Sequence, residues 1–96
     1  RDAAAEIICY DVTDETSFES VNYWVGEMER NAGENFVMAL AGNKIDSITS
    51  GNARAVPLEM SRTVARQHSM VYEDTSAKTG QGIVELFGEL AQRISD

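Results

Sequence analysis

The fold is decided by the stretch Phe36–Asp46, which reads FVMALAGNKID. Its first six residues are apolar without any polar alternation, which predicts a strand covered on both faces, as in parallel sheets. The polar residues 43–46 must then leave the carboxyl end of that strand. Because ligands bind beyond the carboxyl ends of the strands in such sheets, these residues are the first candidate for a binding site.

A strand and a helix are predicted upstream of this stretch. Ala4–Tyr10 ends in residues that favour strands, and Thr16 and Glu19 fit a capping box that opens a helix. The helix should run to about Asn31 and end at Asn31-Ala32-Gly33. Its apolar stripe, which we expect to face the core, consists of Val21, Trp24, Val25 and Met28.

Two helices and one strand are predicted downstream, after a polar loop at residues 47–53. Pro57 suits the first turn of a helix, where its missing N–H costs nothing, and this helix should reach His68. The third strand is expected at Met70–Thr75. In the helix from Pro57 to His68, the inward residues should be Met60, Val64 and Ala65. In the last helix, the apolar residues with helical spacing are Ile83, Leu86, Phe87, Leu90, Ala91 and Ile94.

Alternating strands and helices predict an α/β fold of one domain over residues 1–96, with three parallel strands, three helices and three layers. The polar segments 43–46 and 76–78 both follow strands and should therefore meet at one edge of the sheet. The composition, 43% hydrophobic and 25% charged residues, is that of a globular domain. No apolar run approaches the roughly 20 residues that span a bilayer.

Charge and cysteine content exclude several kinds of partner. The formal net charge is −8, most of it in the first fifty residues, which disfavours nucleic acid and anionic lipid surfaces as partners. The single cysteine, Cys9, cannot form an intramolecular disulfide, and we expect a buried, inert thiol in a reducing compartment. His68, the one histidine, has no second ligand at metal-binding spacing, so no metal site is predicted.

Two segments, Asn43-Lys44-Ile45-Asp46 and Ser76-Ala77-Lys78, carry a resemblance to a known family. Together they match the Asn-Lys-x-Asp and Ser-Ala-Lys motifs with which small GTPases recognise guanine. Flanking residues 8–13, 17–18, 40–42 and 73–79 match as well. Essentially the whole chain resembles Rab-type small GTPases of the Ras superfamily, and among them the early-endosomal subgroup. The resemblance implies the C-terminal half of a P-loop-NTPase-like G domain.

The chemistry of guanine explains why such residues recur. Guanine presents two neighbouring donors, N1–H and the 2-amino group, and the Asp46 carboxylate can accept both. Adenine lacks this pair, and a site built around it can reject the analogue by ~10⁴–10⁵. By the resemblance, Asn43 would bond near N7 and O6, the Ala77 N–H would reach O6, and Ser76 would brace Asp46. The stems of Lys44 and Lys78 would sandwich the base.

Phosphate-binding residues are not found beside these guanine motifs. No G-x-x-x-x-G-K-[ST] string occurs, nor do the two switch motifs of the family, so this chain is expected to bind GTP or GDP weakly through the base alone. We predict no catalytic residue in it and no GTP hydrolysis by it, with Mg²⁺ bound only in the intact parent. Arg1 is interpreted as an internal start.

The resemblance also implies what the intact parent does. It would be a GTP-hydrolysing switch of vesicular and endosomal traffic that meets effectors and exchange or activating factors. It would be cytoplasmic and, once lipidated, peripheral on endosomal membranes.

Two other interpretations of the chain stay open. The first is a non-catalytic interaction module that self-associates by pairing Ala4–Tyr10 edges, with Glu6 opposing that pairing. The second is a flavodoxin-like or receiver-type domain, which suits the topology but leaves both polar segments unexplained. Taken alone, Asn-Lys-x-Asp is also compatible with an ordinary polar turn.

Overall fold

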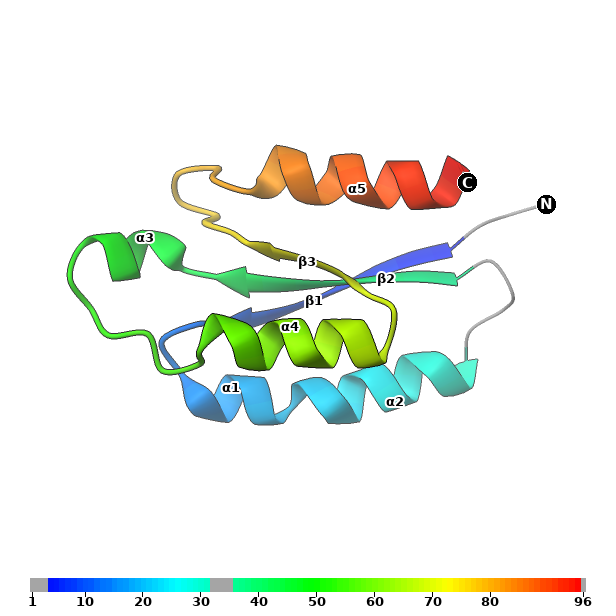
Figure 1. Cartoon of the computed structure of the whole chain (residues 1–96), viewed down its shortest axis with the longest axis horizontal. Helices are drawn as coiled ribbons and strands as arrows, with labels where there is room; N and C mark the ends of the chain where they lie inside the picture. Colours follow the sequence, from blue (N-terminus) through cyan, green and yellow to red (C-terminus); the bar gives the residue numbers. More distant parts are fainter. Residues whose placement is uncertain (1–3, 32–35, 96) are drawn as a thin grey trace.

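Three strands and five helical segments follow one another in the part of the chain that the computed structural model describes, residues 4–31 and 36–95 (Figure 1). In chain order they are β1 (Ala4–Asp11), α1 (Glu15–Glu19), α2 (Val21–Asn31), β2 (Phe36–Asn43), α3 (Ile45–Thr49), α4 (Leu58–Gln67), β3 (Val71–Asp74) and α5 (Ile83–Ser95).

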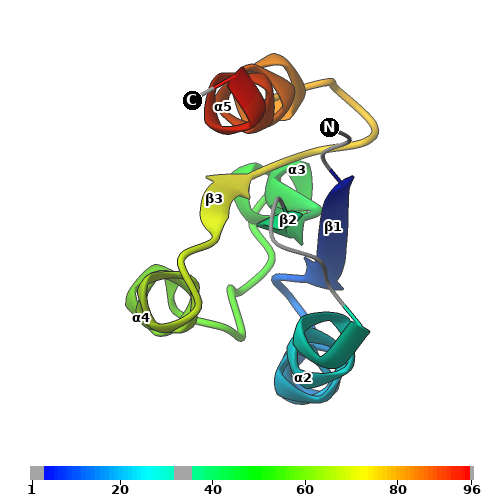
Figure 2. The same cartoon turned by 90° about the vertical axis from the view of Figure 1, so that its right-hand side faces the viewer.

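The strands form a parallel sheet in the order β1-β2-β3, which confirms the predicted α/β architecture. Helix α5 covers one face of the sheet, and α1, α2 and α4 cover the other, so that three layers result (Figure 2). The short helix α3 follows β2 at the carboxyl end of the sheet (Figure 1). All three strands therefore deliver their following segments to one edge.

The core lies on both faces of β2, as the unbroken apolar run predicted. Met38 and Leu40 face the larger cluster, whereas Ala39 and Ala41 face α5. The larger cluster also contains Ile8, Tyr10, Val12, Val21, Val25, Val56, Val64, Ala65 and Met70. The smaller one is completed by Val71, Leu86 and Leu90.

The start of the first helix differs from the prediction. Asp14 is the N-cap of α1, and its carboxylate accepts the Thr16 N–H at 3.0 Å, so the predicted capping box of Thr16 and Glu19 is wrong. The turn before it is closed by the Asp14 N–H, which donates to the Asp11 carbonyl at 3.0 Å. The chain therefore enters the helix two residues earlier than predicted.

The number and limits of the helices also differ from the prediction. The first predicted helix is divided at Ser20 into α1 and α2, and α3 occupies part of the predicted loop 47–53. Pro57 and His68 cap α4 instead of belonging to it. The predicted helix end at Asn31-Ala32-Gly33 lies largely outside the described residues.

Several predicted core residues are exposed in the structure. Val21 and Val25 are buried, but Trp24 is 51% exposed and packs edge-on against Tyr23. In α4, Met60 is exposed and Ser61 is buried in its place; in α5, Phe87 and Ile94 are exposed while Leu86 and Leu90 are buried. Each helix buries fewer residues than its apolar stripe contains: Val21 and Val25 in α2, Ser61, Val64 and Ala65 in α4, and Leu86 and Leu90 in α5.

Cys9 is also exposed, contrary to the prediction of a buried thiol. It alternates with Ile8 and Tyr10, which are buried in the larger cluster, and so points to the face that α5 covers. Helix α5 packs mainly on β2 and β3, which leaves this part of β1 open.

Carboxylates gather where β3 meets α5. A hydrogen bond with Glu89, partial burial, and the charges of Glu89 and Glu85 raise the pKa of Glu73 to about 7 from its ordinary 4.5. The folded chain therefore binds this proton more tightly than the unfolded chain does. The resulting stabilisation is present below the unfolded pKa and is lost as the pH rises through the folded pKa.

We expect Glu73→Gln to remove part of this pH dependence, because the neutral amide resembles the protonated carboxyl. The melting temperature of the unchanged chain should fall as the pH rises from about 4.5 to 7, and the variant should fall less. Glu19→Gln, at an exposed acid on α1, is the control and should keep the slope of the unchanged chain. Equal slopes in all three proteins would contradict the assignment.

A glycine turn joins β3 to α5. Gly82 has a φ of +77°, and a Cβ there would lie 2.1 Å from the Asp74 carbonyl oxygen. Gly80 also has a positive φ, +86°, but a Cβ there would meet nothing within 4 Å. Both glycines have a left-handed backbone conformation, whereas only at Gly82 would a Cβ collide with the backbone of β3.

This difference predicts unequal losses of stability. Gly80→Ala should lose about 1–2 kcal/mol for a left-handed alanine. Gly82→Ala should lose clearly more, because the end of β3 must move to admit the methyl group. Chemical denaturation of both variants measures the difference, and similar losses would show that the close approach at Gly82 is unimportant.

Candidate functional site

The predicted site residues meet at the carboxyl edge of the sheet. A cavity of about 280 Å³ is lined by Asn43, Lys44, Asp46, Ser47, Ala77 and Lys78. Five of the six predicted residues are in this lining, and the sixth, Ser76, is buried and bonded to Asp46. Two segments that are far apart in the sequence are therefore brought to one place, as expected for segments that follow neighbouring parallel strands.

Ser76 holds the Asp46 carboxylate. Its hydroxyl donates to Asp46 Oδ1 at 2.7 Å, and its oxygen accepts the Thr79 N–H at 3.0 Å. Because the Thr79 N–H occupies the oxygen of Ser76, the hydroxyl proton is directed to Asp46. A carboxylate has about four acceptor sites, so Asp46 retains capacity for two further donors.

Asn43 joins the two segments directly. Its side-chain oxygen accepts the Ala77 N–H at 3.0 Å and the Thr75 hydroxyl at 3.4 Å. The two N–H groups of the same amide are then the donors that Asn43 can offer to a ligand. The Ala77 N–H, predicted to reach a base oxygen, bonds to Asn43 in the structure and would have to share or exchange this acceptor.

Backbone hydrogen bonds fix the two segments to each other. The Thr75 N–H donates to the Gly42 carbonyl at 2.8 Å, and the Ile45 N–H donates to the Thr75 carbonyl at 3.0 Å. Between these bonds Lys44 takes the left-handed conformation, with a φ of 70°. This turns the chain sharply out of β2 and into α3, which carries Asp46 in its first turn.

Lys44 is held by Asp11, a residue that was not among the predicted site residues. Its ammonium lies 3.0 Å from Asp11 Oδ2, at the end of β1. Partial burial works to raise the pKa of Asp11, but hydrogen bonds from Thr13 and the charge of Lys44 outweigh it, and the pKa lies below its ordinary value. Asp11 pairs with Asn43 across the sheet, which is the signal that could have identified it.

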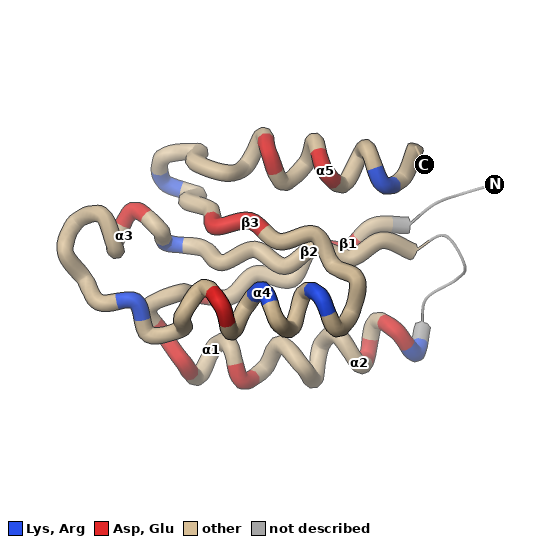
Figure 3. The backbone as a smooth tube through the Cα atoms, in the orientation of Figure 1, with Lys and Arg blue, Asp and Glu red and all other residues tan. Residues whose placement is uncertain are grey.

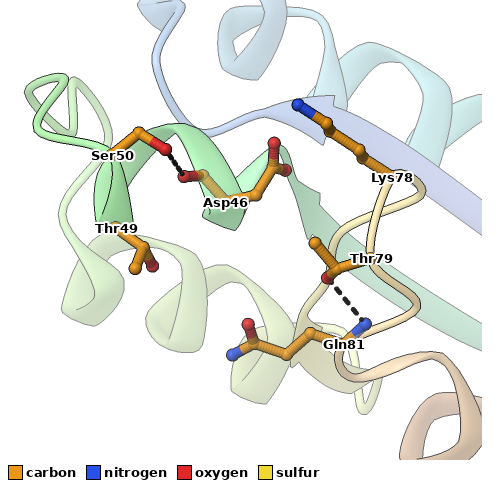
Figure 4. A pocket seen from close by; sticks show the side chains of 6 residues that line it. All are labelled: Asp46, Thr49, Ser50, Lys78, Thr79 and Gln81. Atoms are coloured by element: carbon orange, nitrogen blue, oxygen red, sulfur yellow. Dashed lines mark hydrogen bonds between the residues drawn. The ribbon is translucent and has the colours of Figure 1, made fainter.

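A second cavity adjoins the first on the other side of Asp46. It measures about 330 Å³, and Asp46 and Lys78 line both cavities. Its walls come from α3 and from the turn after β3, which face each other in Figure 4. Thr49, Ser50, Thr79 and Gln81 complete the lining. Thr49 and Ser50 lie in the predicted loop 47–53, and Thr79 and Gln81 lie in the turn after residues 76–78; no motif in the sequence marks either pair.

Charge at this edge differs from that of the chain as a whole. Acidic and basic residues are both spread over the helices, and two of the basic residues lie at this edge, one at the start of α3 and one in the turn after β3 (Figure 3). These two are Lys44 and Lys78, the lysines of the cavity. A chain of formal charge −8 thus presents cationic side chains where a negatively charged ligand could approach.

Behind the cavity lies an ion pair that the sequence did not predict. Arg54 donates two hydrogen bonds to Asp74, Nη1 to Oδ2 and Nη2 to Oδ1, both at 3.0 Å. Burial works to raise the pKa of Asp74, but bonds from Arg54 and Tyr72 outweigh it and hold the pKa below its ordinary value. Twenty residues separate the two partners, and no sequence pattern links them.

The described residues contain neither a metal-binding cluster nor a membrane-spanning helix. Within 4–31 and 36–95, no group of three or more His, Cys, Asp or Glu side chains is placed to hold a metal ion. Over those residues, too, every helix is too short or too polar to cross a bilayer.

Comparison with known proteins identifies the family of the chain. The sequence profile of the Ras family matches residues 1–96. The chain is 44% identical to the Ras-related protein RABF2b of Arabidopsis thaliana, over 98% of this chain and 46% of the relative. It is 40% identical to Ras-related protein Rab5A of Oryza sativa subsp. japonica and 39% identical to Ras-related protein Rab-5A of Dictyostelium discoideum, again over 98% of this chain and 45% of each relative.

The chain thus spans less than half the length of these relatives. The profile match nevertheless covers every residue, and the relatives share the Rab5 or RABF2 designation. Together with the parallel α/β sheet, these matches identify the chain as a member of the Ras family, with relatives among its Rab5-like proteins.

Proposed function

We propose that this chain is the guanine-reading half of a Rab-like small GTPase, and that the smaller cavity holds the guanine base of GTP or GDP. The single observation that carries the proposal is the Asp46 carboxylate, oriented by Ser76 and placed beside Asn43 and Ala77. Membership of the Ras family supports the choice of ligand.

Five residues of the cavity have a role in this proposal. Asp46 accepts the N1–H and 2-amino protons of guanine, a donor pair that adenine lacks. Asn43 donates toward N7 and O6, and the Ala77 N–H reaches O6. The apolar stems of Lys44 and Lys78 pack against the two faces of the ring, with their ammonium groups in solvent.

The activity of the whole protein is proposed from the family. The intact protein binds and hydrolyses GTP with Mg²⁺, interacts with effectors and with exchange or activating factors, and acts in vesicular traffic on endosomal membranes to which a lipid anchors it. The Rab5 designation of the relatives supports this. The described residues offer no Mg²⁺ ligand set, so no step on this chain is assigned to the metal.

Nucleotide titration tests the proposal on the chain itself. GDP and ATP are titrated by calorimetry, each with and without Mg²⁺. We expect weak binding of GDP that Mg²⁺ does not change, and weaker or no binding of ATP. No phosphate release from GTP is expected, since positioned phosphate and metal contacts drive that reaction. Equal affinity for both nucleotides would refute the base-reading role.

Asp46→Asn gives a sharper test, because it replaces an acceptor with a donor while keeping the shape. Guanine affinity should fall at least about tenfold, and xanthosine diphosphate, whose 2-oxo group accepts a hydrogen bond, should bind better than GDP. Asp14→Asn is the matched control: it removes the same charge near the same edge, and Asn caps a helix as well as Asp. An unchanged base preference in Asp46→Asn would remove Asp46 from the site.

Self-association is a second candidate function, favoured by the edge position of β1. Within the described residues β1 pairs only with β2, and Glu6 on it is exposed. An unpaired eight-residue edge can pair with a second copy, and an edge charge opposes this.

Light scattering at micromolar concentration measures this association. We expect the mass of a dimer. The Glu6→Thr variant should form the dimer at a lower protein concentration than the unchanged chain, and the Glu19→Thr variant should form it at the same concentration. A monomer mass for all three proteins with cooperative melting would exclude this role.

A further inference from the structure

A row of residues crosses the sheet immediately before the base-reading segments. Tyr10 of β1 pairs with Gly42 of β2, and Gly42 pairs with Asp74 of β3. The next residue of β2 is Asn43, and Thr75 follows Asp74. Any shift of this row therefore moves the first residues of both segments.

Two tyrosine hydroxyls meet above this row. The hydroxyls of Tyr10 and Tyr72 are 2.9 Å apart, and Tyr10 is also hydrogen-bonded to Ser61 of α4. The Tyr72 hydroxyl donates to Asp74 Oδ1 at 2.6 Å. These bonds connect both outer strands and α4 through side chains that are buried or partly buried.

Gly42 makes room for the hydroxyls. A Cβ at this position would lie 2.3 Å from the Tyr72 hydroxyl oxygen and 2.8 Å from that of Tyr10. These distances are far below van der Waals contact, so the tyrosines could not meet over any other residue. Gly42 is required here for space, because its φ is not in the left-handed region.

An arginine closes the network. Arg54 holds Asp74 with two bonds, approaches the Tyr72 hydroxyl at 3.3 Å, and donates through Nε to the Val56 carbonyl at 2.6 Å. Burial and the bond to Asp74 raise the pKa of Tyr72 well above its ordinary value. The phenol therefore stays protonated and remains a hydrogen-bond donor to Asp74.

The network acts on the site through Thr75. This buried residue follows Asp74 directly, accepts the Ile45 N–H and donates its own N–H to Gly42. Its hydroxyl also reaches the oxygen of Asn43. The position of Asp74 thus sets where Ser76 and Ala77 lie relative to Asn43 and Asp46.

We propose that Tyr72, supported by Tyr10 over Gly42, is a positioning residue that sets the separation of the two base-reading segments and thereby the preference for guanine. The second half of this statement rests on the proposed function, whereas the first half does not. The ion pair of Arg54 and Asp74 anchors the strand end. The Tyr72 hydroxyl links that anchor to β1 and α4.

Amide hydrogen exchange tests the positioning without a nucleotide. Tyr72→Phe removes one oxygen and keeps the ring, so the chain should fold. We expect exchange at the Ile45, Thr75 and Ala77 amides to accelerate by at least roughly two- to tenfold, with α5 unchanged, because the bonds of the hydroxyl to Asp74, Tyr10 and Arg54 are lost and a single bond accounts for that much.

Two control variants separate positioning from general destabilisation. Tyr23→Phe removes an exposed hydroxyl on α2 and should change nothing. Leu90→Val loosens the core under α5 and should affect these loop amides no more than the rest of the chain.

Base selectivity provides the second readout. The ratio of the dissociation constants for inosine diphosphate, which lacks the 2-amino group, and GDP should fall roughly two- to tenfold in Tyr72→Phe. Gly42→Ala, which displaces the same hydroxyls, should lower the ratio as well if it folds. Leu90→Val should leave the ratio unchanged.

The two readouts separate the inference from the proposed function. Unchanged loop exchange in Tyr72→Phe overturns the positioning role, whatever the nucleotide data are. If exchange accelerates while the unchanged chain shows no preference for GDP, the positioning role is supported and the proposed function fails. If exchange accelerates but the selectivity ratio stays constant in a guanine-preferring chain, the role in selectivity is overturned.

Discussion

The parallel pairing of β2 with a strand on each side is the constraint from which the site follows. Parallel strands have to end at the same edge, so the segments after β1, β2 and β3 meet although they are far apart in the sequence. Burial of β2 on both faces fixes its register, because a slip of one residue would exchange Leu40 and Ala41 between the two core clusters. With the register fixed, Asp11 faces Asn43, and Lys44 can reach its carboxylate partner.

The sequence alone was sufficient to predict those features of the structure that depend on residues close together in the chain. The apolar run of β2, the helical spacing of α5 and the polar turns after two strands are all local patterns, and the structure reproduces them. The meeting of residues 43–46 with 76–78 could also be predicted, because it needs only the rule that parallel strands share an edge. The pairing of Ser76 with Asp46 followed from the family resemblance.

Other features could not be predicted because a distant partner decides them. Ser61, and not the predicted Met60, is buried on the inner side of α4, where its hydroxyl is hydrogen-bonded to Tyr10. Trp24 is exposed because the contact line of α2 is narrow, and Cys9 because α5 lies over the other two strands. Arg54 and Asp74 find each other only in three dimensions. The two-residue error at the start of α1 has the opposite origin, since Asp14 and Thr16 are both acceptable caps and competed locally.

The absence of a side chain at position 42 restricts the order in which this sequence can diverge. A methyl group there collides with both tyrosine hydroxyls and also lies 2.9 Å from Val12 Cγ1. A larger residue at position 42 is therefore tolerated only after both tyrosine hydroxyls have been lost and Val12 has moved or changed. Either tyrosine, in contrast, can be replaced first without such a collision. Substitution of the two tyrosines should therefore precede any replacement of Gly42 as this sequence diverges.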